Sequence, residues 1–291
     1  MSANLQLLFA GVANGCIYAL IGISFVLIYN AVGIINFAQS GLVTLGGYLA
    51  VMFVNTLEFG FLPSLLCCSA IMAVVGVVFE RLIYRPLQHR GWLLVIISTI
   101  GVTMILQQLC RLLWTAQPLR MKSLFSVFSY DLGIVKVNPQ YLLIIGTAIV
   151  LLVVQYLIFE CTMVGKKLTA TAQDRQMARL MGINTSRMIT LTFMYSMMLA
   201  AISGFLLVPL NYATTIMAVT PSMKAFVAAI IGGFGSIPGV ITGGLFIGIV
   251  ETFGGRFISS GMKDAIAFIL LILFLVVRPT GFFGEKSSRR V

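Results

Sequence analysis

Charged residues are scarce in this sequence. Only 9% of its 291 residues are charged, and eight of them are acids, whereas about a quarter of the residues are charged in a typical soluble domain. So few charges cannot cover the surface of a soluble globule. The chain is 59% hydrophobic, and its apolar runs of roughly 20 residues have the length of membrane-spanning helices, unlike the alternating pattern of barrel strands. The sequence therefore predicts an all-α polytopic membrane protein.

Acidic side chains are missing from the middle of the apolar runs. Glu80, Glu160, Glu251 and Asp264 all fall at or near predicted span boundaries. Proton-coupled transporters and pumps normally carry intramembrane acids, so that class is not expected. The single histidine, His89, lies in a basic loop, where we expect it to be solvated, and the five cysteines lack metal-ligand spacing. We predict no catalytic residue, metal site or cofactor on this chain, and an energy source on another chain.

The net charge of +11 could indicate nucleic-acid binding. The 19 basic residues, however, lie in short loops between apolar runs and form no patch with interleaved aromatics. Positively charged loops on the cytoplasmic side of a membrane explain them better. The first ten residues contain no basic region, and the apolar run behind them continues to about Tyr29, which predicts a retained first span instead of a signal peptide.

The apolar runs predict about eight segments in a single transmembrane domain of residues 1–291. They cover residues 5–29, 34–54, 62–83, 93–113, 140–160, 189–209, 223–250 and 264–277. The seventh segment is long for one span, and its middle is interrupted by glycine and proline between residues 232 and 239. It is either one long helix or two pieces joined by a turn.

Counting basic residues on each side distinguishes these two possibilities. If residues 223–250 form a hairpin, the loops 81–90, 161–187 and 278–290 share one side and carry 12 of the 19 basic residues. If they form a single crossing, the division is 10 to 9. The positive-inside rule favours the hairpin, with the loop 161–188 and the tail 278–291 cytoplasmic and the N-terminus outside.

Two glycine-rich turns interrupt the apolar runs and resemble one another. Aligning Gly41 with Gly239 places Thr44 opposite Thr242, which indicates a weak internal repeat. Broken helices at matching places in two halves are typical of transporter substrate paths, since unwound backbone inside a membrane must be buried or line a wet cavity. We therefore predict broken or re-entrant helices and a substrate pathway at these turns. The predicted pathway residues are Asn36, Phe37, Gln39, Ser40, Gly41, Gly235, Ser236 and Pro238.

The alternative is that these glycines only allow helices to pack closely. We prefer that interpretation for the pairs Gly11/Gly15 and Gly244/Gly248, which have GxxxG spacing.

The run from Cys161 to Arg187 is the one long polar stretch, and its spacing predicts a short helix over residues 169–181. Met177, Leu180 and Met181 form an apolar stripe, and Gly182 stands where a C-terminal cap belongs. We predict that this helix docks on a partner protein. The alternative is a solvated loop whose charges only set topology, which is our interpretation for Lys166 and Lys167. The predicted docking residues are Ala172, Asp174, Arg175, Arg179, Met181 and Gly182.

Several motifs resemble those of one family. They are GCIYAL at 15–20 with Tyr29 and INFA at 35–38; Glu80-Arg81 and Tyr84-Arg85-Pro86; AQDRQMARLMGIN at 172–184 with LTF at 191–193; MKAFVAAIIGGFGSIPGVITGGLFIGIVE at 223–251; and RPTGFFG at 278–284. With them the chain resembles the permease subunits of bacterial ATP-binding-cassette importers for branched-chain amino acids, and specifically the first of their two paralogous permeases. The resemblance covers nearly the whole chain.

The resemblance implies a permease that moves branched-chain or related hydrophobic amino acids into the cytoplasm across the inner membrane. The implied partners are a periplasmic solute-binding protein, a second paralogous permease and two cytoplasmic ATPase subunits, which would bind ATP and magnesium. The family's coupling loop corresponds to residues 172–184. Where the family usually has His-Gly-Glu after NFA, this chain has Gln39-Ser40-Gly41, so an importer of urea or short amides stays an alternative. An ATP-independent channel and a structural membrane protein are alternatives of other classes.

Overall fold

The computed structural model describes residues 2–88, 90–122, 130–131, 136–137, 139–278 and 280–283. His89 and residues 284–291 of the predicted tail lie outside the described residues. The chain forms two compact units. Unit 1 comprises Met1–Val26, Phe125–Gly146 and Thr220–Val291, and unit 2 comprises Leu27–Leu124 and Thr147–Val219.

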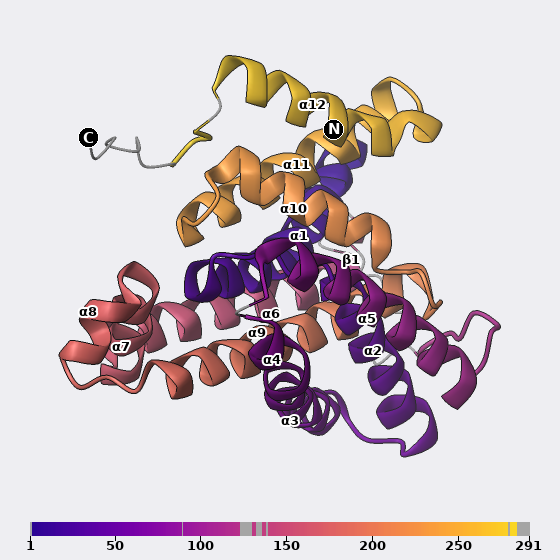
Figure 1. Ribbon diagram of the computed structural model, residues 1–291. Helices are drawn as coiled ribbons and strands as arrows, with labels where there is room; N and C mark the ends of the chain where they lie inside the picture. Colours follow the sequence, from indigo (N-terminus) through magenta and orange to yellow (C-terminus); the bar gives the residue numbers. More distant parts are fainter. Residues whose placement is uncertain are drawn as a thin grey trace. The chain divides into compact units, whose positions relative to one another are not determined.

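Helices make up nearly all of the described secondary structure (Figure 1). Two of them, α1 (Ser2–Val32) and α6 (Pro139–Tyr156), contribute to both units. Unit 2 also holds α2 (Gln39–Val51), η1 (Met52–Thr56), α3 (Phe61–Phe79), η2 (Glu80–Tyr84), α4 (Arg85–Leu87), α5 (Trp92–Leu113), η3 (Leu157–Cys161), α7 (Met163–Gln173), α8 (Arg175–Leu180) and α9 (Thr185–Asn211). Unit 1 also holds the antiparallel pair β1 (Tyr130–Asp131) and β2 (Lys136–Val137), then α10 (Val219–Gly232), α11 (Ile237–Phe257), η4 (Ser260–Met262) and α12 (Lys263–Val277).

Six helices in the described part of the chain are long and apolar enough to cross a membrane. They are α1, α3 with η2 and α4, α5, α6 with η3, α9 and α11. The prediction of an all-α polytopic membrane protein is confirmed. The predicted spans 34–54 and 264–277 are the shorter elements α2 with η1 and α12. The first residues of span 34–54 form a turn instead of a helix.

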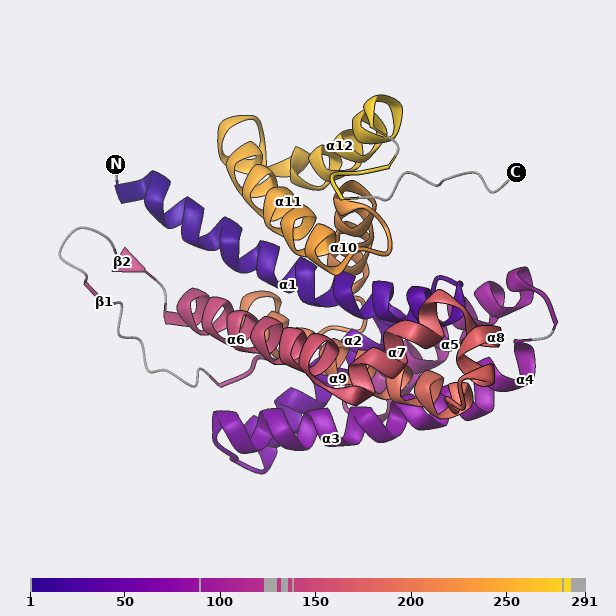
Figure 2. The same cartoon turned by 90° about the vertical axis from the view of Figure 1, so that its left-hand side faces the viewer.

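Unit 2 is built around α9, which packs against α2 and α3 (Figures 1 and 2). Small residues make these contacts. A Cβ at Gly46 would lie 2.6 Å from Cα of Ala201, and one at Gly76 would lie 2.8 Å from Cα of Met194. Close backbone approach through small residues is the usual basis of helix packing in membranes. This packing fixes α2, which begins directly after the turn that follows α1.

The predicted segment 223–250 is two helices in unit 1, α10 and α11. They run antiparallel, since a Cβ at Gly239 would collide with Gly232 and one at Gly243 would collide with Ala228. The helices are separated by residues 233–236, where Gly233 and Gly235 have φ of +106° and +107°, a conformation that favours glycine. The prediction of a hairpin is therefore right, and a single long helix is excluded.

The two GxxxG pairs face one another within unit 1. A Cβ at Gly15 would lie 2.9 Å from the carbonyl oxygen of Gly244, and one at Gly248 would collide with the backbone of Gly11 and Gly15. The helices α1 and α11 thus pack backbone to backbone along these glycines. The packing interpretation of both pairs is confirmed.

Candidate functional site

The turn that follows α1 is built by glycine and an asparagine side chain. Gly33 ends the helix with φ of +73° and donates its N–H to the carbonyl of Tyr29 at 2.7 Å. Oδ1 of Asn36 accepts a hydrogen bond from the N–H of Ala38 at 3.1 Å. This side-chain turn is a common use of asparagine, and it sets the start of α2 at Gln39.

Helix α5 fixes the backbone of this turn. The N–H of Phe37 donates to Oγ1 of Thr99 at 3.2 Å, and Oγ1 of Thr103 donates to the carbonyl of Phe37 at 2.9 Å. A Cβ at Gly41 would lie 3.1 Å from Cα of Thr103, so glycine lets α2 approach α5. Both polar groups of the Phe37 backbone are therefore satisfied at a place where water is scarce.

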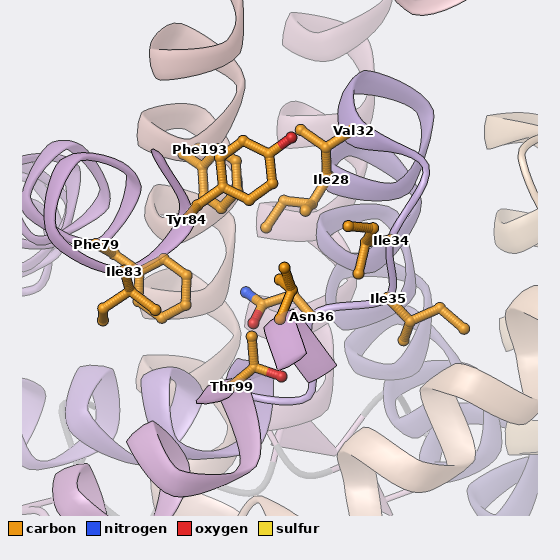
Figure 3. Close-up of a pocket in the computed structure, with 11 residues that line it drawn as sticks. Ile28, Val32, Ile34, Ile35, Asn36, Phe79, Ile83, Tyr84, Thr99 and Phe193 are labelled. Atoms are coloured by element: carbon orange, nitrogen blue, oxygen red, sulfur yellow. The ribbon is translucent and has the colours of Figure 1, made fainter. Parts of the chain in front are cut away.

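A small pocket, with room for about one water molecule, lies beside the turn within unit 2 (Figure 3). It is lined by Ile28, Val32, Ile34, Ile35, Asn36, Phe79, Ile83, Tyr84, Val95, Thr99 and Phe193. Figure 3 shows the amide of Asn36 pointing into it from the turn. Asn36 is 3% exposed, and its Nδ2 has no hydrogen-bond partner among the described residues. A buried donor without a partner costs about 1–3 kcal/mol, so the pocket favours a guest that offers this amide an acceptor.

The chemistry of the pocket is that of a small apolar site with one polar anchor. Aliphatic and aromatic side chains form nearly all of the wall, and the Thr99 hydroxyl already accepts from the turn. Such a wall favours apolar groups, and its one amide offers a donor to a hydrogen-bond acceptor. Of the predicted pathway residues in this unit, Asn36 lines the pocket, whereas Phe37, Gln39, Ser40 and Gly41 form the turn and the start of α2.

The second predicted turn, in unit 1, shares one side-chain hydrogen bond with the first. Ser236 caps α11 by accepting from the N–H of Gly239 at 3.3 Å, and Pro238 lies in the first helical turn. The sixth residue of α11, Thr242, donates to the carbonyl of Pro238 at 3.2 Å, as the sixth residue of α2, Thr44, donates to that of Ser40 at 2.9 Å. The two turns therefore share this threonine hydrogen bond but not their caps, since Ala38 at the N-cap of α2 makes no side-chain cap hydrogen bond.

The C-terminal segment covers part of this second turn. The N–H groups of Phe282 and Phe283 donate to the carbonyls of Ile231 and Gly232, each at 2.9 Å. These carbonyls end α10 and would otherwise lack partners inside the helix. Gly235, Ser236 and Pro238 thus belong to a turn that is bound by Phe282 and Phe283 at its start and capped by Ser236 at its end.

The polar loop 161–188 contains two short helices, not the single predicted helix over residues 169–181. Asp174 interrupts it with φ of −151° and caps α8, accepting from the N–H groups of Gln176 at 2.8 Å and Met177 at 3.0 Å. Aspartate is a favoured N-cap because its carboxylate satisfies the free amides of the first turn. The break separates α8 from Ala172 in α7.

The predicted end of α8 is confirmed. Gly182 has φ of +79° and donates its N–H to the carbonyl of Arg179, and Ile183 donates to that of Ala178, both at 3.0 Å. This pair of hydrogen bonds is the Schellman arrangement. Asn184 then caps α9 by accepting from the N–H of Arg187 at 3.1 Å.

The predicted apolar stripe of α8 lies on the surface. Met177, Leu180 and Met181 are 61%, 81% and 82% exposed, whereas Ala178 on the other face is 4% exposed. Figures 1 and 2 show α7 and α8 beside one another at one end of α9. Three large exposed apolar side chains at the end of a polar loop form a surface suited to a protein partner.

The two arginines of α8 bind inside the chain. Both are predicted docking residues, but Arg175 donates from Nε and Nη2 to the carbonyl of Ala31, at 3.1 and 2.5 Å. Arg179 donates from Nε to Oγ1 of Thr185 at 2.9 Å. The exposed side of α8 therefore carries three large apolar side chains beside the exposed Arg179, and the sequence pattern did not show which atoms the arginines bind.

Comparison with known proteins identifies the family to which this chain belongs. The family described as "Branched-chain amino acid transport system / permease component" matches residues 7–275. This chain belongs to that permease family. LivH of Escherichia coli K12, a high-affinity branched-chain amino acid transport system permease protein, is 34% identical over 305 residues, covering 99% of this chain and 97% of LivH. BraD of Pseudomonas aeruginosa, described in the same words, is 34% identical over 99% of this chain and 98% of BraD.

A solved structure supports the fold. PsaBC from Streptococcus pneumoniae, in complex with Fab, matches with a TM-score of 0.51 at 13% identity, over 95% of this chain and 92% of that chain. At this identity the match concerns the fold alone.

This permease also contains a buried charged cluster in unit 1 that the sequence analysis missed. Nζ of Lys224 in α10 lies 2.9 Å from Oε1 of Glu251 in α11 and 2.6 Å from Oδ1 of Asp264. Nζ of Lys263 lies 3.1 Å from Oε1 of Glu251, and the hydroxyl of Tyr18 donates to Oε2 of Glu251 at 2.9 Å. A lysine inside an apolar segment was the signal, because such a charge is costly unless it is paired.

Proposed function

We propose that this chain is a translocation subunit of an ATP-driven importer of branched-chain or related hydrophobic amino acids. The observation on which this proposal rests is the match, over nearly the whole chain, to a permease family named for that transport. The apolar surface around the unpaired Asn36 amide supports it, since these substrates combine an apolar side chain with hydrogen-bond acceptors. The chain itself performs no catalysis in this proposal.

The proposed partners supply substrate and energy. A periplasmic binding protein delivers the amino acid, a second paralogous permease completes the pathway, and two cytoplasmic ATPase subunits bind ATP and magnesium. The two glycine-rich turns contribute the pathway residues of this chain. Asn36 is the proposed substrate contact in unit 2, and the turn with Gly235, Ser236 and Pro238 is the proposed contribution of unit 1.

We further propose that α8 receives the motion of an ATPase. Its exposed side chains Met177, Leu180 and Met181 would enter an apolar groove of the partner, in the manner of helix-in-groove recognition. Asp174 and Gly182, which fix the two ends of α8, keep this helix in a defined position on the loop.

The proposed location is the inner membrane, with the N-terminus periplasmic and the C-terminus cytoplasmic. The hairpin of α10 and α11 supports this orientation, because it leaves 12 of the 19 basic residues on the cytoplasmic side. It also places α8 on the side where ATP is available.

The test is transport by the reconstituted complex. The chain is assembled in proteoliposomes with its permease paralogue, ATPases and binding protein, and uptake of leucine, isoleucine, valine and urea is measured with and without ATP. The proposal expects uptake of the three amino acids only with ATP. Uptake of urea instead would assign the chain to the related amide importers, and uptake without ATP would identify a channel.

A further inference from the structure

Arg175 joins the docking loop to the pocket. Its guanidinium donates to the carbonyl of Ala31 from Nε and Nη2, and Nη2 also lies 3.4 Å from the hydroxyl of Tyr84. All three residues belong to unit 2. The first residue of α8 therefore contacts two segments that are distant from it in sequence.

The carbonyl of Ala31 is a favourable acceptor because it lies in the last turn of α1. Carbonyls at the end of a helix lack intrahelical partners, and the helix dipole adds negative charge there. Gly33 ends α1 directly after this carbonyl, and the turn that carries Asn36 follows. Ile28 and Val32, on the same end of α1, line the pocket. Arg175 thus binds the end of the helix that supplies one wall of the pocket.

Tyr84 belongs to the opposite wall. It ends the π-helical turn η2, lines the pocket, and its ring centroid lies 5.2 Å from that of Phe193. Figure 3 shows its hydroxyl end pointing toward Val32 across the pocket. One guanidinium therefore contacts both the α1 wall and the η2 wall.

We propose that Arg175 is a positioning residue that transmits movement of α8 to the pocket and so couples ATP use to substrate passage. This inference rests on the proposed function. The helix α8 is fixed at its two ends by Asp174 and Gly182, so a push on exposed Leu180 displaces Arg175 with it. Displacement of the guanidinium releases the end of α1 from Tyr84, which opens the pocket wall beside Asn36.

The test compares variants in the reconstituted complex, with ATP hydrolysis and leucine uptake measured in the same vesicles. Arg175→Gln removes the charge and most of the donors, whereas Arg175→Lys keeps the charge but loses the planar fork. We expect Arg175→Gln to raise the ATP hydrolysed per leucine imported about tenfold, as expected from losing a hydrogen bond to a charged group. Arg175→Lys should give a smaller increase.

Two further variants separate coupling from folding. Tyr84→Phe removes only the hydroxyl and keeps the ring on Phe193, so it should raise the same ratio modestly in a complex that assembles normally. Arg187→Gln removes an exposed charge from the same loop and should leave the ratio unchanged. A purely structural role would lower hydrolysis and uptake together, leaving the ratio constant.

The outcomes are distinct. An unchanged ratio in both Arg175 variants and in Tyr84→Phe would overturn the inference while leaving the importer function in place. If Arg175→Gln did not assemble, Arg175→Lys and Tyr84→Phe would decide by the same ratio. A wild-type complex without ATP-dependent uptake would overturn the proposed function and this inference together.

Discussion

The ammonium of Lys224 lies 2.9 Å from the carboxylate of Glu251, and both side chains are almost completely buried, at 4% and 1% exposure. Removing Glu251 leaves the buried Lys224 with Asp264 alone, and removing Lys224 leaves Glu251 with Lys263 and Tyr18. Because one charged partner remains in each case, we expect Lys224→Met or Glu251→Gln to lower the free energy of unfolding by less than the roughly 3–5 kcal/mol that a fully unpaired buried charge costs, about 1–3 kcal/mol. Thermal unfolding in detergent would measure this.

The double variant of this pair gives the sharper result. Lys224→Met combined with Glu251→Met should be less damaging than the sum of the single changes, because no buried charge is left without its partner. Asp264→Asn removes the second partner of Lys224. Because this carboxylate is 62% exposed, its loss should cost less than that of Glu251. Additive single and double changes would mean that the pair does not act as a unit.

The amide of Asn36 has two separable roles. Asn36→Ser keeps an oxygen that can accept from the N–H of Ala38 but no longer reaches into the pocket with a donor. We expect stability close to that of the wild type and leucine uptake reduced roughly tenfold, from the loss of one buried hydrogen bond to substrate. Asn36→Leu should lower both stability and uptake. Wild-type uptake by Asn36→Ser would show that this residue only builds the turn.

The exposed side chain of Leu180 tests the docking surface. Leu180 is 81% exposed, so Leu180→Asp should change the stability of the isolated chain by less than about 0.5 kcal/mol. Loss of a central apolar contact should weaken co-purification of the ATPase by more than about tenfold. Lys167→Ala, an exposed change on α7, should leave co-purification unchanged. Equal loss in both variants would argue for a general charge effect.

The glycine contact between α1 and α11 predicts a matched pair of substitutions. A methyl group at Gly248 would meet the backbone of Gly15, whereas a Cβ at Gly101 has no atom within 4 Å in the described part of the chain. We expect Gly248→Ala to destabilise the protein by about 1–3 kcal/mol. Gly101→Ala should be neutral or stabilising by up to about 1 kcal/mol. Thermal unfolding of both variants would compare them, and similar values would contradict backbone packing at Gly248.

Hydropathy and charge predicted most of the fold because they follow from the membrane itself. The long apolar runs predicted the helices, and the distribution of basic residues favoured a hairpin at 223–250 over a single crossing. Gly182 was predictable as a helix end since the Schellman arrangement favours glycine there. Asp174 could have been read as a cap by the same reasoning, but the predicted helix over residues 169–181 ran through it.

Contacts between distant segments were beyond the sequence. Nothing near Arg175 indicates that its acceptor is the carbonyl of Ala31, 144 positions earlier. Lys224 was visible as a charge in an apolar segment, but its partners at 251 and 264 come from two other elements whose packing sets their distances. The pocket likewise joins side chains of α1, η2, α5 and α9, and only tertiary packing brings them together.

The hydrogen bonds from Phe282 and Phe283 to Ile231 and Gly232 have a consequence for biosynthesis. These two donors follow α10, α11 and α12 in the sequence, so they are synthesised after all three helices. Until then the last carbonyls of α10 lack these partners, which is costly wherever water is scarce. Synthesis of the segment after α12, not formation of the hairpin, therefore completes the hydrogen bonding of this turn.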